Sequence, residues 1–107
     1  MSDAVEFEIR GGVAFISLNR PGKLNAINED VLSGLRAAIT TLRDDPQAGA
    51  AVLRGRGRAF SAGGDITAMS DMDEATFSRT IGLYMAMAED FRACPKPIIA
   101  AIHGYAL

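Results

Sequence analysis

Residues 13–18 restrict the fold most, because this run of apolar side chains is interrupted only by Ser17. A strand that is apolar on both faces is typical of an interior position in a layered fold, where both faces are covered. The preceding residues 5–10 alternate apolar and charged side chains, and Gly11 and Gly12 separate the two segments. This pattern predicts a hairpin whose second strand is central in the sheet.

A helix is predicted after this hairpin, with Asn28 as its N-cap and Pro46 just beyond its end. Residues 50–53 then form a short apolar run. A strand that a helix separates from the previous strand runs parallel to it through a right-handed crossover. The predicted class is therefore α/β with parallel β-α-β units. The apolar residues of the helix recur at helical spacing: Val31, Leu32, Leu35, Ala38, Ile39 and Leu42.

A second, longer helix is predicted to begin at Asp73 as its N-cap. Met85 and Met87 are interpreted as packing residues, since flexible thioethers commonly fill gaps in a core. Residues 98–102 are predicted to be a further buried strand. Because no helix follows in this sequence, the apolar strand favours a longer chain, a complementary chain or an obligate oligomer. The apolar face of the helix is predicted from spacing: Phe77, Ile81, Tyr84, Ala88 and Phe91.

Residues 59–66 place two adjacent glycines, Gly63 and Gly64, before a short predicted helix. Neither glycine has a Cβ, so the backbone bends sharply and leaves its N–H groups uncovered. With Asp65 as the helix N-cap, amide donors and the positive helix end would converge at Gly64. Such a loop resembles an oxyanion hole, and a plain tight turn between a strand and a helix is the alternative.

Composition narrows the possible partners. A length of 107 residues with 49% hydrophobic content suffices for one domain with a core and not for two. A net charge of −2 gives no positive field for nucleic acid or an anionic membrane, so neither is expected as a partner. One cysteine and one histidine favour a reducing compartment without a structural metal. No apolar run approaches the ~18 residues of a membrane span, and the predicted location is the cytoplasm.

Three blocks of sequence follow one another along the chain, at residues 18–21 with 24–27, 59–66 and 96–107. Together they resemble the crotonase (enoyl-CoA hydratase/isomerase) superfamily. The resemblance covers nearly the whole chain and implies a ββα-spiral fold. Because family members are longer, residues 1–107 are expected to form the N-terminal part of a single domain whose C-terminal part lies outside this chain.

The resemblance implies binding of acyl-CoA thioesters and stabilisation of an enolate by two backbone N–H groups. Gly64 matches the first of these oxyanion donors, and the second is expected at a glycine just beyond Leu107. The acid/base carboxylates of hydratases are expected further on, so the chain alone is expected to be nearly inactive. Coenzyme A would arrive as part of the substrate, without a separate cofactor. The residues matched to the CoA thioester site are Lys23, Leu24, Ala26, Ala62, Gly63, Gly64, Asp65 and Ile66.

The reaction that the resemblance favours is hydration of a 2-enoyl-CoA, a step of fatty acid metabolism. Enoyl-CoA isomerases, thioester hydrolases and decarboxylases of the superfamily share the same blocks, so these reactions are alternatives. A non-catalytic module that binds a CoA thioester is the alternative outside enzymes. Family members assemble as trimers or paired trimers, which makes a homo-trimer or hexamer, or a complementary chain, the expected assembly.

Several polar residues near these blocks have two interpretations. Asp65 is placed to cap a helix, which is favoured over a role as general base. His103 is interpreted as a structural group, and Ser61 has no histidine or acid at triad spacing. Lys23 fits either a phosphate contact or a solvated loop lysine. Three basic residues beside glycines fit a phosphate-facing edge or a solvated strand end: Arg54, Arg56 and Arg58.

Overall fold

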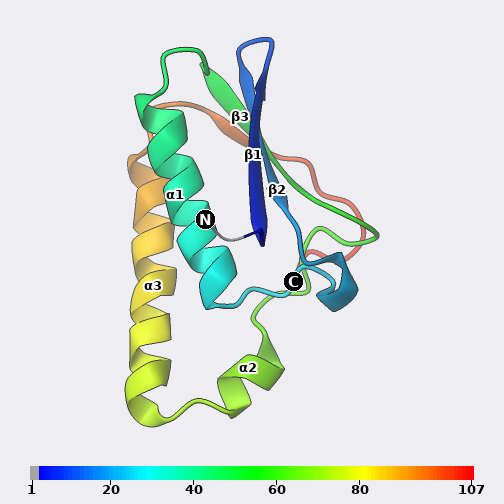
Figure 1. Cartoon of the computed structure of the whole chain (residues 1–107), viewed down its shortest axis with the longest axis vertical. Coiled ribbons are helices and arrows are strands. Elements are labelled where there is room, and N and C mark those ends of the chain that lie inside the picture. The colour runs from blue at the N-terminus through cyan, green and yellow to red at the C-terminus, as the bar shows by residue number, and fades with distance from the viewer. Residues whose placement is uncertain (1–2) are drawn as a thin grey trace.

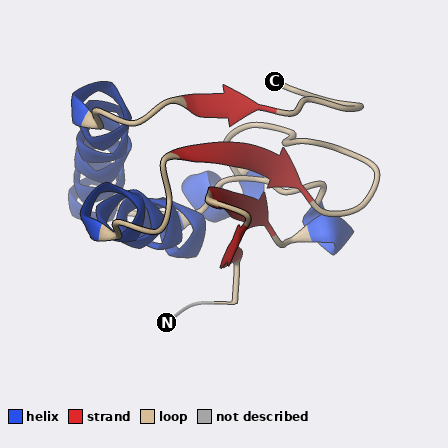
Figure 2. Ribbon diagram, turned by 90° about the horizontal axis from the view of Figure 1, so that it is seen from above, coloured by secondary structure: helices blue, strands red, loops and turns tan. Residues whose placement is uncertain are grey.

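The computed structural model describes residues 3–107 as a four-stranded sheet with helices packed beside it (Figure 1). The strand order is β1-β2-β3-β4, and the predicted α/β class is confirmed. Helix α1 packs against β1 and β2, and α3 runs alongside α1 (Figure 2). The elements in chain order are β1 Val5–Arg10, β2 Val13–Leu18, the 3-10 helix η1 Pro21–Lys23, α1 Glu29–Asp44, β3 Ala50–Gly55, α2 Ile66–Ser70, α3 Glu74–Ala93 and β4 Ile98–Ala100.

β1 and β2 form the predicted antiparallel hairpin, in which Arg10 lies opposite Val13. The turn depends on glycine, because Gly11 and Gly12 have φ angles of 58° and 82°, a region that other residues rarely adopt. On its other side β2 pairs in parallel with β3, so β2 is an interior strand as predicted. Ile16 of β2 is fully buried in the core between the sheet and α1.

Helix α1 begins and ends where the sequence predicts. The Asn28 Oδ1 atom accepts a hydrogen bond from the Val31 N–H at 3.0 Å, which satisfies one of the first amides of the helix. Asp45 follows as the C-cap, directly before Pro46. One face of the helix is buried: Val31, Leu32, Gly34, Leu35, Ala38, Ile39 and Leu42. This face fixes α1 on the sheet and so fixes the loops at both of its ends.

The predicted helix and its N-cap Asp73 are confirmed, but three of the five regularly spaced apolar residues of α3 are exposed. Thr80 is the one buried residue of α3. Met87 and Phe91 pack against the core, so the packing interpretation is confirmed for Met87, whereas Met85 is 69% exposed. The physical reason is that, in the part of the chain described, α3 packs mainly on α1. Two further large apolar residues of α3 remain exposed: Phe77 and Ile81.

The last strand also departs from its prediction as a buried strand at residues 98–102. β4 spans only Ile98–Ala100 and pairs in parallel with β3 at the edge of the sheet. Successive side chains of a strand point to opposite faces. Ile98 therefore packs against the core, whereas Ile99 on the opposite face is 62% exposed. Ile102, beyond the strand, is exposed as well.

Candidate functional site

Two segments that are distant in sequence run side by side beyond the C-terminal ends of strands β2 and β3. Because β2 and β3 are parallel, the segments that follow them leave the sheet at the same end of the strands. Residues 24–27 and 62–65 are joined there by backbone hydrogen bonds, and these bring together the two groups of residues matched to the CoA thioester site. The bonds are Ala62 N–H to Leu24 O at 2.9 Å, Ile27 N–H to Gly63 O at 2.7 Å, and Asp65 N–H to Ile27 O at 2.9 Å.

Asn25 holds the first of these segments in place, a role that was not predicted from the sequence. Its side chain is fully buried; Oδ1 accepts from the Arg20 N–H at 2.8 Å, and Nδ2 donates to the carbonyls of Arg56 and Ala59 at 2.9 and 2.8 Å. Leu24 and Asn25 have φ angles of 52° and 54°. Asparagine tolerates this left-handed conformation better than most residues, and that preference was the available signal.

Ser61 links the segment at residues 24–27 to the segment at residues 62–65. Its buried hydroxyl donates to the Asn25 carbonyl at 2.8 Å and accepts the Gly63 N–H at 3.1 Å. Gly63 has a φ of 92°, and a Cβ at this position would lie 3.1 Å from the carbonyl oxygen of Leu107. Ser61 is therefore a structural residue, and Gly63 is required by both its conformation and its neighbour.

Gly64 differs from its neighbours Ala62, Gly63 and Asp65 because its N–H has no hydrogen-bond partner among residues 3–107. The amides of Ala62, Gly63 and Asp65 are all engaged. A Cβ on Gly64 would lie 3.2 Å from the Met69 methyl carbon and 3.3 Å from a tyrosine hydroxyl of α3. The loop thus fixes the Gly64 peptide while leaving one donor unused, which is the chemical requirement for holding an anionic oxygen.

Asp65 is the N-cap of α2, as predicted. Its Oδ1 accepts from the Ala68 N–H at 3.0 Å, and its Oδ2 lies 3.1 Å from Nη1 of Arg20. The same Nη1 donates to the Ala26 carbonyl at 2.6 Å, so Arg20 joins both segments. The Ala68 amide, and then Arg20, lower the pKa of Asp65. A carboxylate engaged on both oxygens with a lowered pKa is a poor general base.

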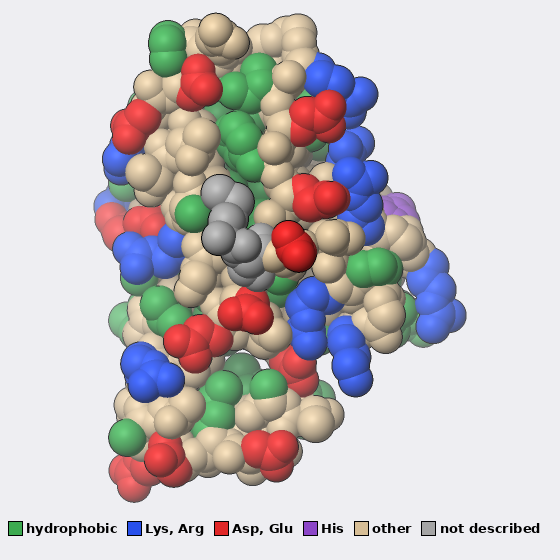
Figure 3. All heavy atoms as spheres, in the orientation of Figure 1, with side chains coloured by type: hydrophobic (Ala, Val, Ile, Leu, Met, Phe, Trp, Pro, Cys, Tyr) green, Lys and Arg blue, Asp and Glu red, His purple; other side chains and the backbone are tan. Residues whose placement is uncertain are grey.

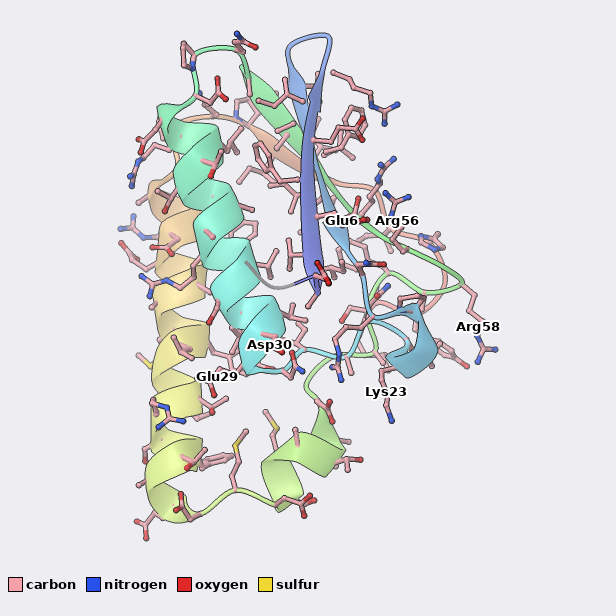
Figure 4. The ribbon with its side chains drawn as sticks, in the orientation of Figure 1. Glu6, Lys23, Glu29, Asp30, Arg56 and Arg58 are labelled. Atoms are coloured by element: carbon pink, nitrogen blue, oxygen red, sulfur yellow. The ribbon has the colours of Figure 1, made fainter. Side chains whose placement is uncertain are left out.

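Some basic side chains near the site are paired with other side chains, whereas others are exposed to solvent. Arg54 donates to a hydroxyl of β2 at 2.9 Å, and Arg56 pairs with Glu6 of β1 at 2.6 Å, so both guanidinium groups already have partners in the sheet. Lys23 and Arg58 are exposed and extend into solvent from neighbouring turns (Figure 4). Figure 3 shows basic side chains gathered along the right-hand side of the molecule, where Lys23 and Arg58 lie in Figure 4. Lys23 is close enough to contribute to the lowered pKa of Asp65.

Tyr84 reaches the site from α3, although the sequence indicated only a packing role. Its O–H donates to the Ile27 carbonyl at 3.3 Å, and it is the tyrosine that approaches Gly64. Burial, and then the charge of Asp65, raise the pKa of Tyr84. Helical spacing placed Tyr84 on a face of α3 but carried no signal for the segment that this face meets.

The remaining matched residues and the other candidates are placed as follows. Ile66, the first residue of α2, is 80% exposed beside the loop. His103 lies with Nε2 2.7 Å from the Gly57 carbonyl, which fits its structural interpretation. Residues 3–107 contain no group of three or more His, Cys, Asp or Glu side chains that could hold a metal ion. Within the same span, no helix is long and apolar enough to cross a membrane.

Comparison with known proteins identifies relatives of the chain. The family model for enoyl-CoA hydratase/isomerase matches residues 8–107. The probable enoyl-CoA hydratase echA8 of Mycobacterium tuberculosis (strain CDC 1551 / Oshkosh) is 42% identical over 96 residues, which cover 89% of this chain. A probable enoyl-CoA hydratase of Rhizobium meliloti (strain 1021) is 38% identical over 100 residues and 94% of this chain. The crystal structure of an enoyl-CoA hydratase from Thermoplasma volcanium GSS1 matches 97% of this chain with a TM-score of 0.89 and 36% identity.

The chain spans less than half the length of these relatives, with 36% of the M. tuberculosis protein, 38% of the R. meliloti protein and 42% of the T. volcanium chain covered. Over the part that is shared, the high TM-score confirms the expected crotonase-type α/β fold. Since the family model covers nearly all of the sequence, this chain belongs to the enoyl-CoA hydratase/isomerase family.

Proposed function

We propose that this protein adds water to a 2-enoyl-CoA and that the Gly64 N–H is one of two amides that hold the thioester oxygen. The observation that carries the proposal is the Gly64 N–H, which has no partner among the described residues although its neighbours in the fixed loop are engaged. When water adds across the C2–C3 double bond, negative charge develops on the thioester oxygen. A fixed donor stabilises that charge more strongly in the transition state than in the ground state, which increases the rate.

The CoA part of the substrate is proposed to lie along the paired segments. Lys23, Leu24 and Ala26 would contact it from one segment, and residues 62–66 from the other. The exposed Lys23 ammonium is available for a phosphate, since residues 3–107 show no ion pair at Lys23. Exposed Ile66 offers apolar surface to the pantetheine or adenine. The proposal needs no cofactor besides the CoA that the substrate carries.

The second amide and the acid/base carboxylates are proposed to lie beyond Leu107, in the part that the longer relatives possess. The contact between Gly63 and Leu107 supports this, because residues following Leu107 would start beside the loop. The isolated 107-residue chain is then expected to hydrate crotonyl-CoA very slowly. Loss of one oxyanion donor alone costs about 10²- to 10³-fold in rate. Assembly as a homo-trimer or hexamer, or with a complementary chain, and a cytoplasmic location belong to the same proposal.

The test uses the full-length protein that contains this chain, with acetoacetyl-CoA as the probe. Its enolate absorbs in the near ultraviolet, so binding to an oxyanion hole is read as a new absorption band. Gly64→Pro removes the N–H, whereas Gly64→Ala keeps it and serves as the matched control. We expect the band to disappear in the proline variant and to weaken only partly in the alanine variant.

Circular dichroism and the affinity for butanoyl-CoA show whether each variant keeps its fold and its CoA site. An undiminished band in a folded Gly64→Pro variant would overturn the assignment of Gly64. Isomerases, hydrolases and decarboxylases use related enolates, so hydration itself is tested separately by following crotonyl-CoA consumption. Enolate binding without turnover of any thioester would favour the non-catalytic binding module.

A further inference from the structure

The hydroxyl of Tyr84 joins α3 to the backbone pairing that flanks Gly64. Its O–H donates to the Ile27 carbonyl at 3.3 Å. The same carbonyl accepts the Asp65 N–H at 2.9 Å, which is the bond immediately after Gly64 in the parallel pairing. A carbonyl oxygen has two lone pairs and accommodates both donors. Movement of Tyr84 would therefore be transmitted to the Gly64–Asp65 peptide, which adjoins the Gly63–Gly64 peptide that contains the proposed oxyanion donor.

Tyr84 also limits the space around Gly64 directly. A Cβ built on Gly64 would lie 3.3 Å from the Tyr84 hydroxyl oxygen and 3.2 Å from the Met69 methyl carbon. Both distances are shorter than ordinary van der Waals contacts to carbon. The Gly64 peptide is thus confined by its pairing with Ile27 and by two side chains that exclude a larger residue.

We propose that Tyr84 is a positioning residue, which fixes the orientation of the Gly64 N–H through the Ile27 carbonyl. This role rests on the proposed function of Gly64. Its physical basis is that a donor stabilises a developing charge fully only if it needs no reorganisation. A misplacement of about 1 Å costs up to about 10²-fold in rate, so a single buttressing hydroxyl has a measurable effect.

The hydroxyl is suited to this role by its protonation state as well as its position. Burial is the first cause of the raised pKa of Tyr84, and the Asp65 carboxylate is the second. The group stays neutral around neutral pH and keeps its proton for the Ile27 carbonyl. Met69 cannot replace it, since a thioether has no proton to donate.

The first test compares Tyr84→Phe with Tyr105→Phe in the full-length protein. These are the two tyrosines of the chain, and Tyr105 is 59% exposed. For Tyr84→Phe we expect the acetoacetyl-CoA enolate band at saturation to fall about fivefold, as suits one lost hydrogen bond. The affinity for butanoyl-CoA, which forms no enolate, should stay within about twofold. Tyr105→Phe should change neither quantity.

The outcomes separate the two proposals. If the wild-type protein binds neither thioester, the proposed function fails and the role of Tyr84 fails with it. If it binds both and forms the enolate, but Tyr84→Phe leaves the band unchanged, only the positioning role is overturned. An equal loss of butanoyl-CoA affinity and enolate band would also overturn it, because that pattern indicates a general structural role.

The second test is a double-mutant cycle between Tyr84→Phe and Gly64→Ala. Removal of the hydroxyl removes its 3.3 Å contact with the new Cβ, so the alanine should reduce the enolate band less in the phenylalanine background. Independent effects on the band would contradict a direct coupling of the two residues. Thermal unfolding of all four proteins verifies that the band is compared among folded molecules.

Discussion

Helices α1 and α3 both show apolar side chains at helical spacing, yet they have different surroundings. α1 buries a continuous face between the sheet and α3, whereas α3, although longer at 20 residues against 16, buries only Thr80. The cause is the number of partners: α1 contacts β1, β2 and α3, while α3 packs mainly on α1 within residues 3–107. Apolar spacing therefore predicts that a helix forms, but the elements around it decide whether its face is buried.

The largest expected effect is a difference in stability between the two helices. Leu32 of α1 is fully buried, so Leu32→Ala should lower the free energy of unfolding by about 2–5 kcal/mol. Met85 of α3 is 69% exposed, so Met85→Ala should change it by less than about 0.5 kcal/mol. Urea denaturation of both variants measures the contrast. Similar losses of unfolding free energy in the two variants would contradict the expected difference between the helices.

A second experiment extends the comparison to the loop before α1. Asn25→Ala removes three hydrogen bonds from a buried side chain and should cost about 3 kcal/mol of unfolding free energy. Asn28→Ala removes one capping bond and should cost about 1 kcal/mol. Equal costs in urea denaturation would mean that the Asn25 network contributes no more than an ordinary helix cap.

The neighbouring isoleucines of β4 provide the next test. Ile98 packs against the core and Ile99 is 62% exposed, so the same substitution reports on the two faces of one strand. Ile98→Ala should cost about 1–2 kcal/mol, since the side chain is only partly buried. Ile99→Ala should cost less than about 0.5 kcal/mol. A larger loss at Ile99, measured by thermal unfolding, would indicate that its face is covered in solution.

The smallest expected effect is a pH dependence at the caps of the two later helices. The Ala68 amide and Arg20 lower the pKa of Asp65, and Thr76 lowers the pKa of Asp73. A lowered pKa in the folded state gives stability that is complete well above the unfolded value of about 4 and is lost as pH falls below it. Asp65→Asn should therefore flatten the acid limb of the stability curve.

Asp73→Asn is the matched control, since both aspartates are N-caps and asparagine also caps helices. We expect it to flatten the acid limb less, because Asp65 has Arg20 as an additional partner. The measurement is urea denaturation at a series of pH values between neutral and strongly acidic. A steeper acid limb in Asp65→Asn than in the wild type would contradict the sign of the effect.

Local chemistry accounts for the features that sequence alone predicted. The caps Asn28, Asp65 and Asp73 act on amides three residues later, and the hairpin turn depends on two adjacent glycines. Within residues 3–107, the exposure of α3 could not be predicted, because it depends on which elements pack on it. Asn25 and Tyr84 were missed for the same reason, since their partners come from distant segments.

The long-range contacts that hold the Gly64 loop also determine when this loop forms during folding. The loop is held by a hydrogen bond between Asn25 and Ala59, 34 residues apart, and by Ser61 pairing with Tyr105 and Leu107. A peptide of residues 59–66 alone lacks these constraints and would not hold the loop. Loop-closure entropy opposes each of these long-range contacts until the sheet has formed. The loop geometry on which the proposed anion binding depends should therefore appear late in folding, with the docking of residues 101–107.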